Sequence, residues 1–127
     1  MKITNDRGSS YGCDVLPDRD VVRVAPWGEL DIAAVESLAE ELDALWQAGF
    51  TRVVLDLSGL TFIDSSGLHL VLTQTAAARS AGHSLTLVPG PDSVQRVFAL
   101  CGVLGQLSFA TVLSARRSRP EVQPAAI

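Results

Sequence analysis

The sequence is poor in the residues that several kinds of functional site require. It has ten lysine and arginine residues in total, but Lys2 is its only lysine. A P-loop needs a lysine beside the nucleotide phosphates, so the sequence argues against such a site. The two cysteines, Cys13 and Cys101, are far apart, without a CxxC pattern or a histidine near either in sequence. We therefore expect two reduced, partly buried thiols, with neither a metal site nor a cofactor.

Long apolar runs are also missing. No uninterrupted apolar stretch approaches the roughly 20 residues that a membrane-spanning helix needs. The first residues, 1–6, lack the apolar core of a signal peptide. These absences predict a cytoplasmic protein that does not insert into a membrane.

Basic charge is scarce outside the C-terminal end. The net charge of −4 includes +2 from residues 114–127, where Arg116, Arg117 and Arg119 outnumber Glu121, so residues 1–113 carry −6. An acidic body argues against nucleic acid as the main partner. We interpret the arginines, which lie beside prolines, as part of a solvated tail.

Length and composition fit one globular domain. A chain of 127 residues with 47% hydrophobic and 19% charged residues is large enough to bury its own core. Residues 1–10 are polar and lack apolar periodicity, so we expect a flexible N-terminus. The predicted domain covers residues 11–113, and residues 114–127 form a predicted flexible tail.

The first half of the chain predicts a hairpin followed by a helix. Apolar residues in 13–16 and 21–25 flank a segment of turn composition at 17–20, which indicates two antiparallel strands at the edge of a sheet. Pro26 and Gly28 are expected to end the second strand. Asp31 then caps a helix whose apolar residues at 35, 38, 42 and 45 have helical spacing up to Gly49.

The second half alternates strands and helices. A buried strand at 53–57 is followed by a turn at Ser58-Gly59, a short apolar return through 62–63, and a helix that ends at Gly82. The next strand, 84–88, should pair in parallel with the first. A third helix begins with Asp92, and residues 106–109 form a weak last strand before a short helical segment at 110–113. The predicted fold class is α/β, with a mixed, mostly parallel sheet and amphipathic helices.

The tetrad Asp64-Ser65-Ser66-Gly67 opens the second helix and carries the predicted chemistry. Asp and Ser side chains accept hydrogen bonds from the free N–H groups of a first helical turn. Capping needs only one of them, so another hydroxyl is left beside the positive end of the helix. Such a position favours an anion such as phosphate.

The tetrad and its flanks resemble the sequence pattern of the STAS family, in particular the bacterial anti-sigma-factor antagonists. The resemblance rests on the run from Leu60 to Leu68, on Gly28-Glu29-Leu30-Asp31 upstream, and on residues 94–103 downstream, in the family's order. In that family the first serine of the tetrad is phosphorylated by a partner kinase, and the aspartate of the earlier motif lies near it. By position these are Ser65 and Asp31.

The resemblance implies a phosphorylation-controlled binding module rather than an enzyme. The unphosphorylated form would bind an anti-sigma factor of the serine kinase type and free a sigma factor; phosphorylation of Ser65 with ATP as donor would end binding, and a phosphatase would restore it. The implied partner-binding residues are Asp31, Asp64, Ser65, Ser66, Gly67 and His69. His69 stands where the family often has a small residue.

Three alternative functions make different demands on the sequence. A STAS subunit of a regulatory scaffold or transport system would bind without dependence on phosphate. A serine hydrolase would need glycine two residues before Ser65, where this chain has Ile63, and a base oriented by a carboxylate, whereas His69 lies four residues further along the same helix. A phosphoryl-accepting receiver domain would use Asp56 together with a late lysine, which is lacking, so Asp56 is interpreted as a residue that stabilises a turn.

Overall fold

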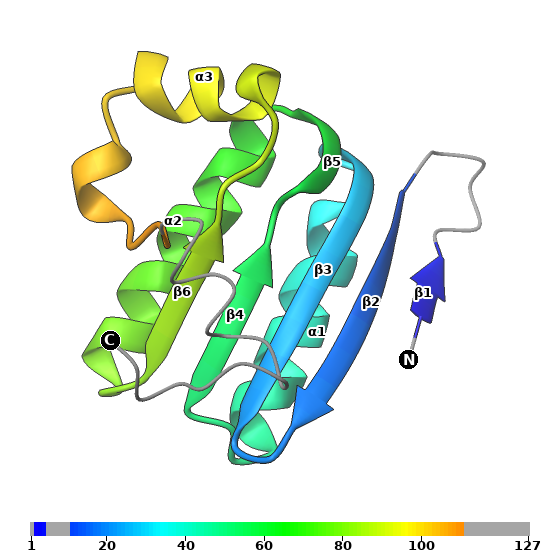
Figure 1. Cartoon of the computed structure of the whole chain (residues 1–127), viewed down its shortest axis with the longest axis vertical. Coiled ribbons are helices and arrows are strands. Elements are labelled where there is room, and N and C mark those ends of the chain that lie inside the picture. Colours follow the sequence, from blue (N-terminus) through cyan, green and yellow to red (C-terminus); the bar gives the residue numbers. More distant parts are fainter. Residues whose placement is uncertain (1, 5–10, 111–127) are drawn as a thin grey trace.

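Six strands form one mixed sheet in the computed structural model, which describes residues 2–4 and 11–110 (Figure 1). The strands are β1 (Lys2–Thr4), β2 (Tyr11–Asp18), β3 (Val21–Leu30), β4 (Arg52–Asp56), β5 (Gly59–Ile63) and β6 (Ser84–Val88). The helices are α1 (Val35–Gln47), α2 (Ser65–Ser80), α3 (Asp92–Leu100) and the short 3₁₀ helix η1 (Leu104–Gln106). The strand order is β1-β2-β3-β4-β6, with β5 also paired to β3. The pairs β1-β2 and β2-β3 are antiparallel and the others parallel, which confirms the predicted α/β class.

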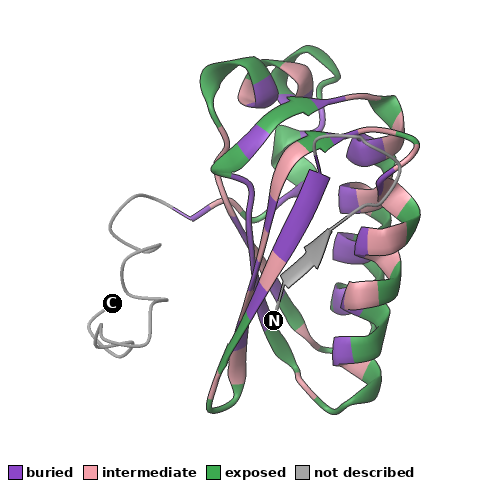
Figure 2. Cartoon of the chain, turned by 90° about the vertical axis from the view of Figure 1, so that its right-hand side faces the viewer, coloured by how far each residue is buried: buried purple, intermediate pink, exposed green. Residues whose placement is uncertain are grey.

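Helices α1 and α2 cover one face of the sheet, and α3 lies across the end at which β5 finishes (Figure 1). Alternate residues of β3, such as Val22 and Val24, are fully buried and face this layer. In α1 the predicted stripe is present, with Leu38 and Leu42 inaccessible to solvent, and each such leucine contributes about 1.5–3 kcal/mol by burial. The buried residues of α1 line the side of this helix that faces the sheet (Figure 2).

The predicted turn at Ser58-Gly59 is present, with the N–H of Leu60 donating to the carbonyl of Leu57 (3.0 Å), but the chain does not return after it, contrary to the prediction. Val21–Val24 of β3 pairs in parallel with β4, and the later part of β3 pairs in parallel with β5, so the chain bends and continues along the same neighbour. Asp56 stabilises the bend, as expected. Its Oδ1 accepts hydrogen bonds from the N–H of Ser58 (2.9 Å) and from its hydroxyl (2.6 Å), while Oδ2 pairs with Arg23.

Strand β3 is longer than predicted because Pro26 and Gly28 do not end it. Pro26 lies between the stretch of β3 that pairs with β4 and the stretch that pairs with β5, so it interrupts neither parallel ladder. Gly28 adopts a positive φ of 88°, next to a register shift in the β3-β5 pairing. Glycine accommodates such a bulge without the steric cost that a Cβ would bring. The strand therefore reaches Leu30 and delivers Asp31 to the end of the sheet.

The N-terminal part also differs from expectation. Lys2–Thr4 form β1 and pair antiparallel with β2, so the fold begins before Tyr11 and the hairpin is not the sheet edge. The predicted tail at 114–127 and most of the predicted segment at 110–113 lie outside the described residues. Residues 106–109 give no full strand, only η1 and a bridge between Leu87 and Phe109. The parallel pairing of β4 with β6 is confirmed.

The two cysteines have different environments. Cys101 is exposed, whereas Cys13 is buried in the core. Burial, reinforced by the negative charges of Glu41 and Asp14, raises the pKa of the Cys13 thiol to about 12. No helix in the described part of the chain is long and apolar enough to cross a membrane.

Candidate functional site

The predicted site residues gather where β3 and β5 end side by side. Leu30 and Ile63 are the last paired residues of these parallel strands, and Asp31 and Asp64 follow them directly. The N–H of Asp64 donates to the carbonyl of Leu30 across the two strand ends (3.3 Å). Residues far apart in sequence, the Asp31 turn and the start of α2, therefore form one surface at this edge.

Asp64 is the N-cap of α2. Its Oδ1 accepts hydrogen bonds from the N–H groups of Ser66 (3.0 Å) and Gly67 (3.1 Å). The hydroxyl of Ser66 donates to the same oxygen (2.5 Å). A capping residue of this kind stabilises a helix by about 0.5–2 kcal/mol. Ser66 is thus part of the cap.

Ser65 is the tetrad serine left free by this arrangement. Its side chain is exposed, and no residue in the described part of the chain forms a hydrogen bond with its hydroxyl. The hydroxyl lies in the first turn of α2, where the helix dipole favours negative charge. The two serines therefore differ in their hydrogen bonds, and the hydroxyl of Ser65 is the one that is accessible and unbonded within the described residues.

The carboxyl group of Asp64 is held as an anion. Its partial burial opposes ionisation, but the hydrogen bonds from the Ser66 hydroxyl and from the N–H groups of Gly67 and Ser66, together with the nearby N–H dipole of Ile32, outweigh it and lower its pKa below the ordinary value of 3.8. The Ile32 contribution comes from the turn that follows β3. Asp64 therefore links the start of α2 to the Asp31 turn electrostatically.

Gly67 allows α2 to approach the strand ends. A Cβ at this position would lie 2.7 Å from the carbonyl oxygen of Leu30 and 2.8 Å from Cγ1 of Ile63. Both distances are too short for a real side chain, so only glycine fits without a shift of the helix. The residue packs the first turn of α2 against β3 and β5 and is buried itself.

Asp31 stabilises the turn before α1 rather than capping the helix directly. Its Oδ1 accepts a hydrogen bond from the N–H of Ala33 (3.0 Å), and its carbonyl accepts from Ala34 (2.9 Å) and Val35 (3.0 Å). The N-cap of α1 is Ala34, which makes no side-chain cap. Asp31 is half-buried and lies directly after the end of β3, beside the start of α2.

Two exposed apolar residues at this edge were missed by the sequence analysis. Ile32 is 77% exposed and Phe62 is 48% exposed. Phe62 pairs with Glu29, next to the register shift in the β3-β5 pairing. A hydrophobic pattern alone would place its side chain in the core, but the structure leaves it exposed. His69, also exposed, lies one helical turn beyond Ser65.

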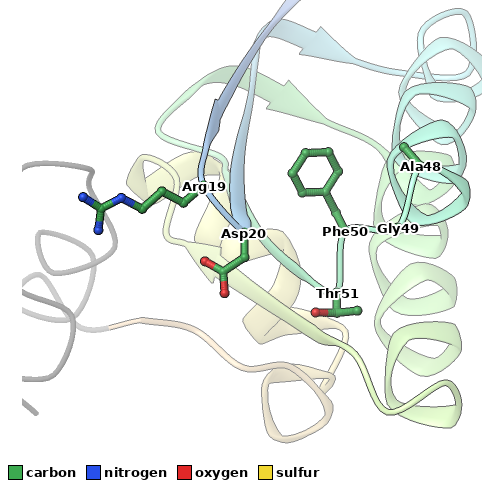
Figure 3. Close-up of a pocket in the computed structure, with 6 residues that line it drawn as sticks. All are labelled: Arg19, Asp20, Ala48, Gly49, Phe50 and Thr51. Carbon is green, nitrogen blue, oxygen red and sulfur yellow. The ribbon is translucent and has the colours of Figure 1, made fainter.

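A small open pocket of about 180 Å³ lies at the opposite end of the sheet (Figure 3). It is lined by Arg19, Asp20, Ala48, Gly49, Phe50 and Thr51. The length of β3 puts about 30 Å between this end and Asp31. The pocket is therefore separate from the site at Ser65.

Among residues 2–4 and 11–110, no group of three or more His, Cys, Asp or Glu side chains is placed so that it could bind a metal ion.

The comparisons with known proteins agree with this arrangement. A family model described as Mlab, STAS domain, matches residues 14–113. The chain belongs to the STAS domain family. Membership of this family agrees with the expectation of a binding module rather than an enzyme.

Several relatives of this STAS domain have names that state a role. The chain is 36% identical over 87 residues to the anti-sigma F factor antagonist of Lysinibacillus sphaericus, which covers 67% of this chain and 74% of that protein. The solved structure of the anti-sigma factor antagonist SpoIIAA in its unphosphorylated form is 27% identical, with a TM-score of 0.67 and coverage of 83% and 93%. The Bacillus cell fate determinant SpoIIAA in the phosphorylated form is 26% identical, with a TM-score of 0.64 and coverage of 84% and 99%.

Proposed function

We propose that this STAS domain is an anti-sigma-factor antagonist controlled by phosphorylation of Ser65. The unphosphorylated form binds an anti-sigma factor of the serine kinase type and so releases a sigma factor. The observation that carries the proposal is the free hydroxyl of Ser65 beside a cap that already uses Asp64 and Ser66. The names of the relatives support the partner class, and similarity to SpoIIAA in both forms supports the switch.

The partner-binding surface in this proposal consists of Asp31, Asp64, Ser65, Ser66, Gly67 and His69, extended by Ile32 and Phe62. Asp64, Ser66 and Gly67 fix the first turn of α2, so Ser65 is held in one place. Asp31 supplies charge, and the two exposed apolar side chains supply the area that a protein interface buries at its centre.

Phosphorylation changes the charge of this surface without requiring a new fold. The Ser65 oxygen attacks the γ-phosphorus of ATP, the bond from that phosphorus to the β,γ-bridging oxygen breaks, ADP leaves, and the hydroxyl proton passes to a base on the kinase. The product carries about −1.5 to −2 charge. At a helix N-terminus this charge gains about 0.3–1 kcal/mol from the dipole, so the domain tolerates it.

Binding is expected to respond much more strongly than folding. A doubly charged group buried in an interface built for a neutral hydroxyl costs several kcal/mol unless it is paired, and each 1.4 kcal/mol is about tenfold in affinity. Affinity should fall by about two orders of magnitude. A phosphatase that removes the group restores the binding form.

The test is phosphorylation by the cognate kinase with ATP, followed by peptide mapping and binding measurements. We expect phosphate on Ser65, and Ser65→Ala should bind its partner whether or not ATP is present. Ser66→Ala is the matched control: it should lose about 1 kcal/mol of stability with its capping hydrogen bond but still be phosphorylated. Phosphate on Ser66 alone would overturn the assignment. Unchanged affinity after phosphorylation would favour a phosphate-independent subunit of a scaffold or transport system.

A further inference from the structure

His69 lies on the same face of α2 as Ser65. The two residues are the fifth and first of the helix, and both side chains are exposed. Residues four apart on a helix have Cβ atoms about 5–6 Å apart. Helical side chains also lean toward the N-terminus, so the imidazole of His69 projects back over the turn that begins with Ser65.

A phosphate on Ser65 has few other groups to neutralise it. The N–H groups of Ser66 and Gly67 already donate to Asp64. Three arginines in the described part of the chain have side-chain partners elsewhere: Arg23 with Asp56, Arg52 with Asp20, and Arg79 with Ser108. Arg19 lies at the opposite end of the sheet. Arg96, on α3, is exposed.

The imidazole of His69 is available for such a contact. No residue within 2–4 and 11–110 makes a hydrogen bond, ion pair or ring contact with it; only its backbone carbonyl accepts a bond, from Thr73. Within the first two turns of α2 it is the sole side chain that can carry a positive charge.

We infer that His69 binds the phosphate on Ser65, which makes the charge of the phosphorylated form depend on pH near neutrality. The inference rests on the proposed phosphorylation of Ser65. A phosphoserine takes up its second negative charge near pH 6. The imidazolium favours the dianion and lowers the pH at which it forms.

Other charges near α2 do not reproduce this effect. The elements that pack most closely against α2 are α1, β5 and β6, and neither strand carries a charged side chain. The residues that follow the two strand ends beside Ser65, Asp31 and Asp64, are acids. Helix α1 contributes acids only, namely Glu36, Glu40, Glu41 and Asp43. These acids disfavour the phosphate dianion and remain in every variant, so a difference between His69 and a neutral replacement isolates the imidazole.

The experiment uses the full chain with phosphoserine incorporated at position 65 during synthesis, so it does not depend on finding a kinase. The ³¹P chemical shift is followed from pH 4.5 to 8.5 for the native sequence and for His69→Gln, which keeps a polar side chain without a titratable charge. We expect the titration midpoint to rise by about 0.2–0.4 pH units in His69→Gln.

Arg19→Gln is the matched control, because it removes a cation at the opposite end of the sheet. Its midpoint should equal that of the native sequence. Equal midpoints for His69→Gln and the native sequence would overturn the inference, and so would a shift in Arg96→Gln without one in His69→Gln. Failure of kinases to modify Ser65 would instead count against the proposed function, because the incorporated phosphoserine still reports on His69.

Discussion

The close contact at Gly67 makes a specific prediction about Gly67→Ala. The new methyl group would lie 2.7 Å from a backbone oxygen of Leu30 and 2.8 Å from Cγ1 of Ile63. The backbone atom cannot rotate away as the end of a side chain can, so the first turn of α2 must move off the strand ends. Ser65 would move with it, relative to Asp31.

Two opposing effects set the magnitude. Alanine is favoured over glycine within a helix by about 1 kcal/mol. Overpacking a close contact costs about 1–3 kcal/mol. The sum of the two effects is a destabilisation of Gly67→Ala by up to about 2 kcal/mol. For a domain of this size, each kcal/mol lowers the melting temperature by roughly 3–6 °C.

Gly105→Ala is the matched control. A Cβ at Gly105 meets nothing within 4 Å, so the same chemical change there should leave stability unchanged or raise it by up to about 1 kcal/mol. Both variants are compared by thermal unfolding, by partner affinity and by the rate of phosphorylation at Ser65. If Gly67→Ala matches Gly105→Ala in all three, the contact with Leu30 does not position α2 and the reasoning is refuted.

Two further predictions concern carboxylates. Asp56→Ala leaves the guanidinium of Arg23 without a counter-charge and should lower the free energy of unfolding in urea by about 3 kcal/mol or more. Asp20→Ala breaks an exposed ion pair and should lower it by less than about 1 kcal/mol. Similar losses in the two variants would show that the ion pair between β3 and β4 is not important for stability. Asp64 has a lowered pKa in the fold, so its charge stabilises the protein above about pH 4, and this contribution is lost as pH falls through the folded-state pKa. Asp64→Asn keeps the cap, and its deficit relative to the native sequence should shrink as pH falls from 5 to 2.5; a constant deficit would contradict the assignment.

The order of elements follows from local patterns and was predictable. The stripe in α1, the strand 53–57 and the parallel partner 84–88 are set by apolar spacing and by glycine stops, which act over a few residues. All three are present, with Leu38, Leu55 and Leu87 fully buried. Such features need no knowledge of distant contacts.

The path of the chain at the site depends on tertiary contacts and was not predictable. Pro26 and Gly28 are ordinary strand-ending signals. Pro26 lies between the stretches of β3 that pair with β4 and with β5, and Gly28 lies next to a register shift in the pairing with β5, so β3 continues through both. This continuation depends on the positions of β4 and β5, which the local sequence does not specify. Ile32 and Phe62 have apolar side chains whose exposure likewise depends on the neighbouring elements.

The capping role of the tetrad was predictable, and the family resemblance already singled out Ser65 rather than Ser66; the coordinates add the hydrogen bonds that hold Ser66 in the cap. An Asp-x-Ser segment forms the same contacts twice in this chain. Asp56 accepts from the N–H and hydroxyl of Ser58, and Asp64 accepts from the same groups of Ser66. In both cases the residue between them takes no part in these bonds.

That middle residue accounts for the different uses of the two segments. Leu57 lies between Asp56 and Ser58 and is fully buried, so the first segment only shapes a bend in the core. Ser65 lies between Asp64 and Ser66 and is exposed at the start of a helix. The hydrogen bonds to Asp64 fix the backbone on either side of Ser65. The second segment therefore presents the Ser65 hydroxyl at a fixed position near the positive end of the α2 dipole. Under the proposed function, a phosphate at this position would alter the surface charge while the bonds that hold the fold remain in place.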